Sequence, residues 1–197
     1  NQTRQIIMKL VIKNEFQEHL ETSKRSMDLI IEQIESAAKI CIDGLENNGK
    51  IILFGNGGSA ADAQHIAAEL VSRYKTERRG LSAIALTTDT SILTAIGNDY
   101  GFEHIFMRQI EALAKPEDVV IAISTGGSSN NVVNALILAK EIGCQTIGLS
   151  GGNGGKFNDI CNVNVLVPSS ETPRIQEMHI FIGHTICQLI DNAFSEN

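Results

Sequence analysis

Hydrophobic residues follow two patterns along the chain. Short continuous apolar runs, typical of strands buried on both faces of a sheet, alternate with segments of helical spacing. The runs predict strands at 51–54, 82–86, 119–123, 145–149 and 162–167. The spacing predicts helices at 59–74, 90–96, 102–113, 130–142 and 174–194. Because no hairpin signal joins the strands, we expect the α/β fold class, with a parallel sheet flanked by helices on both faces.

The first quarter of the chain is helical in pattern. Residues 14–47 keep helical spacing, and we expect a break between two helices near Thr22–Ser23. Residues 1–13 are expected to be an N-terminal leader that need not be ordered, and residues 14–197 a single domain with an N-terminal helical extension. Such apolar helices need a packing partner, either another subunit or a sheet face of the same chain.

Turn and cap residues mark several element ends. Ser59 with Asp62 is a capping-box pattern, so a helix is expected to begin there. Thr172 is a candidate cap with Pro173 at the first helical position. Residues 97–101 are turn formers and predict a loop.

Composition excludes several classes of protein. The chain has 197 residues, 43% of them hydrophobic, and no apolar run long enough for a membrane span or secretory signal, so we expect a cytoplasmic protein without a membrane partner. The net charge of −7 and the lack of a basic block argue against a nucleic-acid partner. The four cysteines lack C-x-x-C spacing, so free thiols are expected rather than a cysteine zinc site.

A histidine and a glutamate stand out on the helix after the first strand. His65 and Glu69 are one turn apart, so their side chains can meet at one point. The pair is compatible with an active site and equally with an ordinary ion pair on a solvated helix face. On the last helix, Gln176 and His184 share a face about two turns apart, roughly 12 Å along the axis.

Glycine-rich turns after strands suggest a phosphate or nucleotide ligand, because helix N-termini offer unpaired N–H groups. Gly55-x-Gly57-x-x-Ala60 fits the loose dinucleotide fingerprint, so a nicotinamide or flavin enzyme is one alternative. However, Asp62 in the first helical turn would repel a pyrophosphate. The loop Ser124–Ser129, with four hydroxyls, two glycines and no acid, is better suited to a single phosphate.

Five motifs occur in order along the chain. They are Gly55-Asn-Gly-Gly-Ser59, Asp62-x-x-His65-x-x-x-Glu69-Leu70, Thr94-Ala-Ile-x-Asn98-Asp99-Tyr100, Ile123-Ser-Thr-x-Gly127-x-Ser129, and Arg174-Ile-Gln-Glu-x-His179 with His184 downstream. Together they resemble the sedoheptulose 7-phosphate isomerases (phosphoheptose isomerases), which belong to the sugar-isomerase, or SIS, domains. The resemblance covers the chain from about Asn14 to its end.

The resemblance implies an aldose–ketose isomerase. It would convert sedoheptulose 7-phosphate to D-glycero-D-manno-heptose 7-phosphate through an enediol, the first step of ADP-heptose synthesis for lipopolysaccharide core or surface heptose. Glu69 would be the base and His184 its acid/base partner. The family also forms homotetramers whose active sites are shared between subunits, and this would account for the apolar N-terminal helices.

The resemblance also implies binding residues. Zinc, one ion per subunit, would be held by His65, Glu69, Gln176 and His184. The substrate would be contacted by Asn56, Gly57, Gly58, Ser59, Glu69, Asn98, Asp99, Ser124, Thr125, Gly126, Ser129 and Gln176.

Two positions depart from the family pattern. Gly126 stands where a serine is usual, which removes one hydroxyl from the phosphate loop, and Pro173 stands where an acid is frequent. One alternative is an isomerase acting on another ketose phosphate. Another is a non-catalytic SIS-domain sugar-phosphate sensor or a regulator that binds the bacterial replication initiator. By the family pattern, those regulators lack the glutamate and histidine that this chain has at positions 69 and 184.

Overall fold

A five-stranded parallel sheet forms the centre of the computed structural model, which describes residues 2–195. The strands are β1 (Ile51–Gly55), β2 (Ala83–Ala85), β3 (Val119–Ile123), β4 (Gln145–Gly151) and β5 (Val163–Val167). Their order is β2-β1-β3-β4-β5, and every neighbouring pair is parallel. All residues of the adjacent strands β1 and β3 are buried, which explains their continuous apolar runs. The predicted parallel sheet is confirmed.

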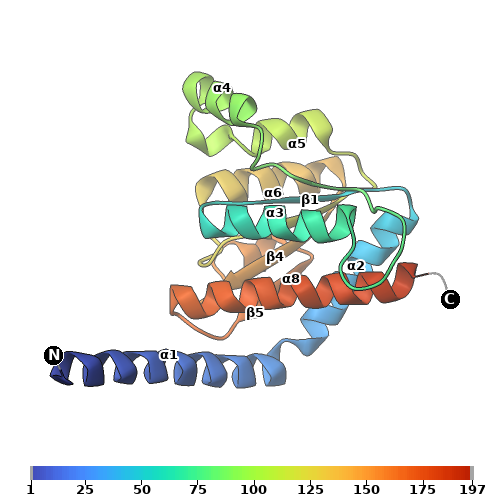
Figure 1. Cartoon of the computed structure of the whole chain (residues 1–197). Helices are drawn as coiled ribbons and strands as arrows, with labels where there is room; N and C mark the ends of the chain where they lie inside the picture. The colour runs from blue at the N-terminus through green and yellow to red at the C-terminus, as the bar shows by residue number, and fades with distance from the viewer. Residues whose placement is uncertain (1, 196–197) are drawn as a thin grey trace.

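Helices cover both faces of the sheet (Figure 1). One face carries α2 (Ile31–Glu46), α3 (Gly58–Val71) and α8 (Thr172–Phe194). The other carries the 3-10 helix η1 (Phe102–His104), α5 (Met107–Leu113), α6 (Asn130–Ile142) and α7 (Phe157–Ile160), with α4 (Thr90–Tyr100) packed on η1. Alternate residues of β1 and β3 enter the two cores, as Leu53 and Phe54 of β1 do.

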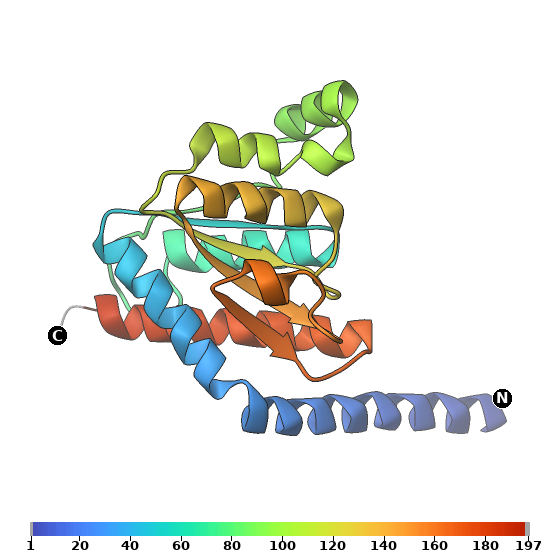
Figure 2. The ribbon, with the colours of Figure 1, turned by 180° about the vertical axis from the view of Figure 1, so that it is seen from behind.

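The N-terminal helix α1 (Gln2–Leu29) extends beyond the α/β core (Figure 2). Residues 2–13, expected as a leader, form its first part in the structure, while Asn1 and residues 196–197 lie outside the described residues. The predicted break at Thr22–Ser23 is wrong, since the helix continues to Leu29 and α2 follows Ile30. Within this helix the Ser26 hydroxyl is satisfied locally, since it donates to the carbonyl of Thr22 one turn earlier.

One arginine ties α1 to the core. Arg174 of α8 is 5% exposed and donates to Glu15 Oε2 at 2.7 Å and to Glu18 Oε2 at 3.3 Å, both on α1. It also binds Glu177 of its own helix at 2.8 Å. Hydrogen bonds to Glu15 and Glu177 raise the pKa of Arg174 although burial lowers it, so the guanidinium stays charged and holds α1 against the start of α8.

Several predicted helix ends are wrong. The N-cap of α3 is Gly57, with φ of +55° and no side-chain cap, so Ser59 and Asp62 do not form a capping box. The N-cap of α8 is Glu171, and Thr172 is already helical. These starts are set by the backbone of the preceding turn rather than by a capping side chain.

The segment around α4 also differs from expectation. The predicted loop 97–101 is mostly helical, because α4 continues to Tyr100 and ends at Gly101, whose φ is +97°. The single helix expected over 102–113 is divided into η1 and α5. The short helix α7 was not predicted, since four residues are too few to show helical spacing.

A fully buried ion pair joins the C-terminal part of α8 to the end of α3. Arg78 Nε donates to Asp191 Oδ1 at 2.7 Å, and both side chains are fully buried. The same guanidinium donates to the carbonyl oxygens of Glu69 at 2.9 Å and Leu70 at 3.0 Å. Burial alone would raise the pKa of Asp191, but hydrogen bonds from two backbone N–H groups and from Arg78 lower it. The pair therefore remains charged and fixes the end of α3 that carries Glu69.

Two further expectations concern the cysteines and the membrane. All four cysteines are free, and burial raises the pKa of the Cys187 thiol to about 12, so this thiol stays protonated at neutral pH. Among the described residues, none of the helices has both the length and the apolar character that crossing a bilayer requires.

Candidate active site

The sheet has a topological switch point between β1 and β3. The two strands are parallel neighbours, but α3 after β1 packs on one face and α6 after β3 packs on the other. In open α/β sheets ligands bind at such a point, outside the carboxyl ends of the strands. The loops that meet there are 55–58 and 124–129, the two loops in which the sequence places most substrate contacts.

The loop 124–129, which we call the anion loop, has a defined backbone. Ser124 and Ser129 place their hydroxyl oxygens 3.3 Å apart, and Gly127 donates its N–H to the carbonyl of Ser124. Gly127 has φ of +63°, and a Cβ there would lie 2.2 Å from the carbonyl oxygen of Gly154. The anion loop thus packs on the loop after β4, and this contact requires a glycine at position 127.

Unlike Gly127, the glycine at position 126, where the family usually has a serine, is not required by the backbone. Gly126 is exposed, and a Cβ built on it would have no atom within 4 Å. Its φ is not positive, since Gly127 is the residue of this loop with that conformation. A side chain would therefore fit at Gly126 without strain, and the glycine here leaves the anion loop with one hydroxyl fewer.

Gln176 faces the loop 55–58, here called the sugar loop. A Cβ on Gly58 would lie 3.1 Å from Gln176 Nε2, so α8 places this amide beside the first turn of α3. Ser59 is buried under the same turn, and its Cβ would be 2.7 Å from a Cβ on Gly55. The structure therefore groups Gln176 with the sugar loop.

The second group of candidate residues lies farther along α3 and α8. His65 Nε2 is 3.2 Å from Glu69 Oε1 on α3, so the predicted meeting of these two side chains is confirmed. His184 of α8 joins them, with its Nε2 at 3.3 Å from His65 Nε2. The two helices approach closely here, as a Cβ built on Gly183 would lie only 2.5 Å from Ile66 Cδ1. We call His65, Glu69 and His184 the acid–base cluster.

The acid–base cluster has the donor spacing of a metal site. Its three ligand atoms all lie within 4.8 Å of one another. In a tetrahedral zinc site with bonds of about 2.0–2.1 Å, neighbouring ligand atoms are roughly 3.3 Å apart. The two contacts of 3.2 and 3.3 Å match that spacing. Two imidazoles and one carboxylate in this arrangement could therefore hold a metal ion.

Two further residues lie next to the cluster: Tyr74, which was not expected there, and Asp62, which shares a helix face with His65 and Glu69 in the sequence pattern. Tyr74 was predicted on the apolar face of the helix, but it follows the helix and stacks on His184 with ring centroids 5.3 Å apart. Asp62 lies one turn before His65, and burial raises its pKa while the charges of His65 and His184 act in the opposite direction. The contact between Tyr74 and His184 depends on the position of α8, which no local pattern indicates.

Not every predicted site residue comes together within one chain. Asn98 and Asp99 lie on α4, which packs on the opposite face of the sheet from α3 and α8, and they are bonded to each other at 2.9 Å. Gln176 stands eight residues before His184 on α8, about 12 Å along the axis. Of the four zinc ligands that the resemblance implies, three lie together in one chain. The fourth, Gln176, lies beside the sugar loop.

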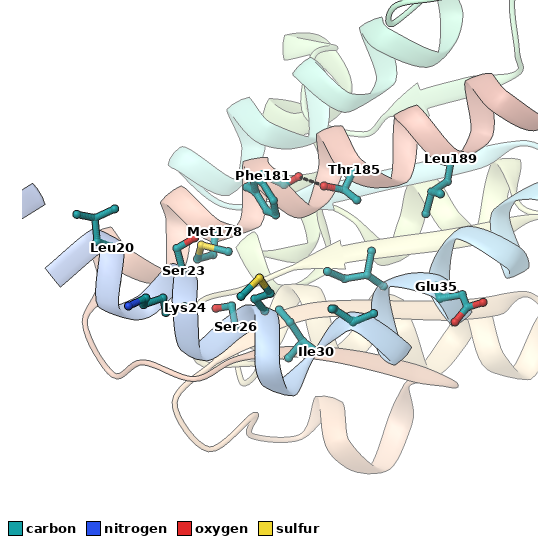
Figure 3. Close-up of a pocket in the computed structure, with 13 residues that line it drawn as sticks. Leu20, Ser23, Lys24, Ser26, Ile30, Glu35, Met178, Phe181, Thr185 and Leu189 are labelled. Carbon is teal, nitrogen blue, oxygen red and sulfur yellow. Dashed lines mark hydrogen bonds between the residues drawn. The ribbon is translucent and has the colours of Figure 1, made fainter. Parts of the chain in front are cut away.

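A wide groove occupies a different part of the molecule (Figure 3). It has a volume of about 600 Å³ and lies between α1, α2 and α8. Its lining is mainly apolar and includes Leu20, Met27, Ile30, Met178 and Phe181. Such a surface suits packing against another apolar surface rather than proton transfer.

Comparisons with known proteins identify the family of this chain. The SIS domain family matches residues 15–151. The phosphoheptose isomerase of Aliarcobacter butzleri is 60% identical over 95% of this chain and its own full length. The solved phosphoheptose isomerase of Neisseria gonorrhoeae has a TM-score of 0.89 at 42% identity, over 94% of this chain and 99% of that one. That of Francisella tularensis also has a TM-score of 0.89, at 36% identity over 92% and 96% of the two chains.

More distant solved structures share the fold at much lower identity. The NanR protein of Vibrio vulnificus, complexed with ManNAc-6P, has a TM-score of 0.66 at 14% identity, which is evidence of a common fold alone. The two solved phosphoheptose isomerases combine a higher TM-score with higher identity over almost the whole chain. This chain belongs to the phosphoheptose isomerase family of SIS-domain proteins.

Proposed function

We infer that this chain is an aldose–ketose isomerase that converts sedoheptulose 7-phosphate to D-glycero-D-manno-heptose 7-phosphate in heptose biosynthesis. The observation that carries the inference is the meeting of Glu69 and His184, which come from distant parts of the chain, in one cluster with His65. A non-catalytic sensor has no need of this arrangement. The product would serve lipopolysaccharide core or surface heptose.

The acid–base cluster holds the two kinds of group that the reaction needs. The Glu69 carboxylate removes a proton from C1 of the ketose while His184 donates one to the carbonyl oxygen on C2, which gives an enediol. Glu69 then returns its proton to C2, and His184 accepts the hydroxyl proton from the oxygen on C1. The carbonyl has moved from C2 to C1, and both side chains have regained their initial protonation states.

The anion loop is suited to the phosphate end of the substrate. Ser124, Thr125 and Ser129 provide hydroxyls, and the N-terminus of α6 provides backbone N–H groups. Within one chain, however, α3 separates Gly58 from Glu69 by eleven residues, about 16 Å along the axis. We therefore propose that the anion loop and the acid–base cluster of one complete site come from different subunits. In that arrangement Asn98 and Asp99 would also be able to contact the substrate.

We propose zinc as the metal ion of the cluster. His65, Glu69 and His184 would hold one ion per subunit, and a bound zinc would supply Lewis-acid polarisation of substrate oxygens. Three protein ligands with one open position are typical of catalytic zinc sites. A carboxylate has two acceptor oxygens and an imidazole has two nitrogens, so metal contacts at Glu69 and at His184 Nε2 would leave one oxygen and Nδ1 for proton transfer.

A homotetramer is the assembly we propose. α1 exposes many large apolar side chains along its length, among them Ile6, Leu10, Phe16, Leu20 and Met27, each more than half exposed. The groove between α1, α2 and α8 continues this surface (Figure 3). Exposed apolar surfaces of this extent indicate protein–protein contact, and other copies of the chain are the partners that a shared active site requires.

The isomerase assignment predicts a specific loss of turnover. Glu69→Gln and His184→Gln should each lower kcat at least about 100-fold, because general acid and base groups typically contribute that much. Conversion of sedoheptulose 7-phosphate, followed by NMR without added nucleotide, measures this. Exposed Glu77→Gln and half-buried His104→Gln, both outside the cluster, serve as controls and should turn over normally. Unchanged turnover in Glu69→Gln would remove the proposed base, and a requirement for nicotinamide or flavin would favour the dinucleotide alternative.

The zinc content of the protein should depend on the residues of the acid–base cluster and not on Gln176. Elemental analysis of the purified protein should find about one zinc per chain, and His65→Ala should lose it. Gln176→Ala should retain zinc, since this amide lies beside Gly58 and the three cluster donors remain. Loss of zinc from Gln176→Ala would instead show that a glutamine, its own or that of another subunit, completes the ligand set.

The size of the particle tests the assembly. Light scattering should give the mass of four chains for the wild type, while Leu20→Glu should give smaller particles because it places a charge in the apolar groove. Glu111→Lys, a charge change on exposed α5, is the control and should leave the mass unchanged. A monomeric wild type would contradict the proposed shared site.

The glycine at position 126 predicts a gain of affinity. Gly126→Ser should lower KM and the inhibition constant of inorganic phosphate by about tenfold or more, since one hydrogen bond to a charged group is worth about 1.5–3 kcal/mol. The matched control is Gly127→Ser, which should weaken phosphate binding because its Cβ would collide with Gly154. Equal effects of the two substitutions would argue against the anion loop as the phosphate site.

A further inference from the structure

Two asparagines connect the sugar loop to the anion side of the switch point. Asn56 Nδ2 donates to Asn131 Oδ1 at 2.9 Å, and Asn131 Nδ2 donates to Asn56 Oδ1 at 2.8 Å. Asn56 belongs to the sugar loop, and Asn131 is the second residue of α6, directly after the anion loop. Asn131 is only 4% exposed, so its amide depends on this partner.

The amide pair lies beyond the end of the β1–β3 pairing. The last paired residues of these strands are Gly55 and Ile123, and after them the chains continue to opposite faces of the sheet. In the described part of the chain, no backbone hydrogen bond joins residues 56–58 to residues 124–131. The relative position of the two loops therefore depends on the Asn56–Asn131 pair.

The pairing also changes the role expected of Asn56. Its amide oxygen and one of its two amide hydrogens have a partner in Asn131, which fixes the orientation of the side chain. The backbone of the sugar loop is exposed at Gly57 and Gly58, which have no side chains to obstruct a sugar. The side chain of Asn56 contributes by keeping that backbone in place.

We propose that Asn131 is a positioning residue that sets the spacing between the sugar loop and the anion loop through Asn56. It does not touch the substrate. A sugar phosphate that spans both loops binds well only when that spacing is fixed, because misplacement of about 1 Å costs much of the benefit of orientation. The proposal rests on the function inferred above, in that both loops are taken to hold one substrate.

A double-mutant cycle tests the proposal. Asn131→Ala, Asn56→Ala and the double variant are compared for KM, kcat and the dissociation constant of inorganic phosphate measured by calorimetry. Asn131→Ala should raise KM about tenfold and weaken phosphate binding, while kcat changes less than threefold, because loop spacing affects binding more than proton transfer. The double variant should resemble either single variant, since both remove the same pair. Fully additive effects, or an unchanged KM in Asn131→Ala, would overturn the proposal.

A matched control separates positioning from general stability. Asn134→Ala removes a side-chain amide from the same helix, where Asn134 donates to the carbonyl of Glu103 at 3.3 Å on the opposite face of the sheet from α3. It should leave KM and phosphate binding unchanged. If Asn131→Ala fails to fold, Asn131→Asp keeps the shape and one hydrogen bond, and it should still raise KM; an unchanged KM there would overturn the proposal.

The two readouts also separate this proposal from the proposed function. Phosphate binding by calorimetry needs no turnover. If the wild type does not convert sedoheptulose 7-phosphate but Asn131→Ala still weakens phosphate binding, the positioning role stands and the isomerase assignment fails. If the wild type converts the sugar and Asn131→Ala binds phosphate normally, the isomerase stands and the positioning role fails.

Discussion

The close approach of α3 and α8 is the contact on which the candidate active site depends. It occurs at Gly183, where a side chain would collide with Ile66, and the next residue, His184, meets His65. Farther along, Arg78 in the segment after α3 joins Asp191 of α8 to the carbonyl oxygens of Glu69 and Leu70 at the end of α3. Removing one partner of such a pair leaves an unpaired buried charge and typically costs about 3–5 kcal/mol. The cluster thus lies between a close helix contact and a fixed ion pair, so its side chains have a stable frame.

The apolar pattern of the sequence was sufficient to predict the sheet. Five short runs gave five strands, and their lack of hairpin turns gave parallel pairing, because a strand buried on both faces has no polar alternation. Helix ends were predicted less well. The start of α3 depends on the positive φ of Gly57 rather than on the cap signal at Ser59, and the end of α1 depends on Ile30 entering the core. Both are consequences of tertiary packing, which local spacing does not contain.

The candidate site also contains some contacts that local spacing predicts and others that depend on tertiary packing. The His65–Glu69 contact follows from four-residue spacing on one helix, so the sequence was enough to predict it. His184 was assigned to it through family resemblance, since its place depends on how α8 packs on α3. The roles of Tyr74 and Asn131 were missed for this reason, because each meets its partner only after strands and helices that are far apart in sequence have come together.

An acidic protein that binds an anionic sugar must attract it by local means. The chain has a net charge of −7, and its anion loop contains no lysine or arginine. Neither the net charge nor a basic side chain of this loop would attract the phosphate, so at the proposed site affinity would come from hydroxyls and backbone N–H groups held in place at the N-terminus of α6. Such donors are weak when they move, since each must be oriented before it helps. This explains why the anion loop is packed through Gly127 on the loop after β4 and is followed directly by the buried Asn131 pair. A rigid loop would keep these donors oriented toward the phosphate, where other phosphate sites rely on a positively charged side chain.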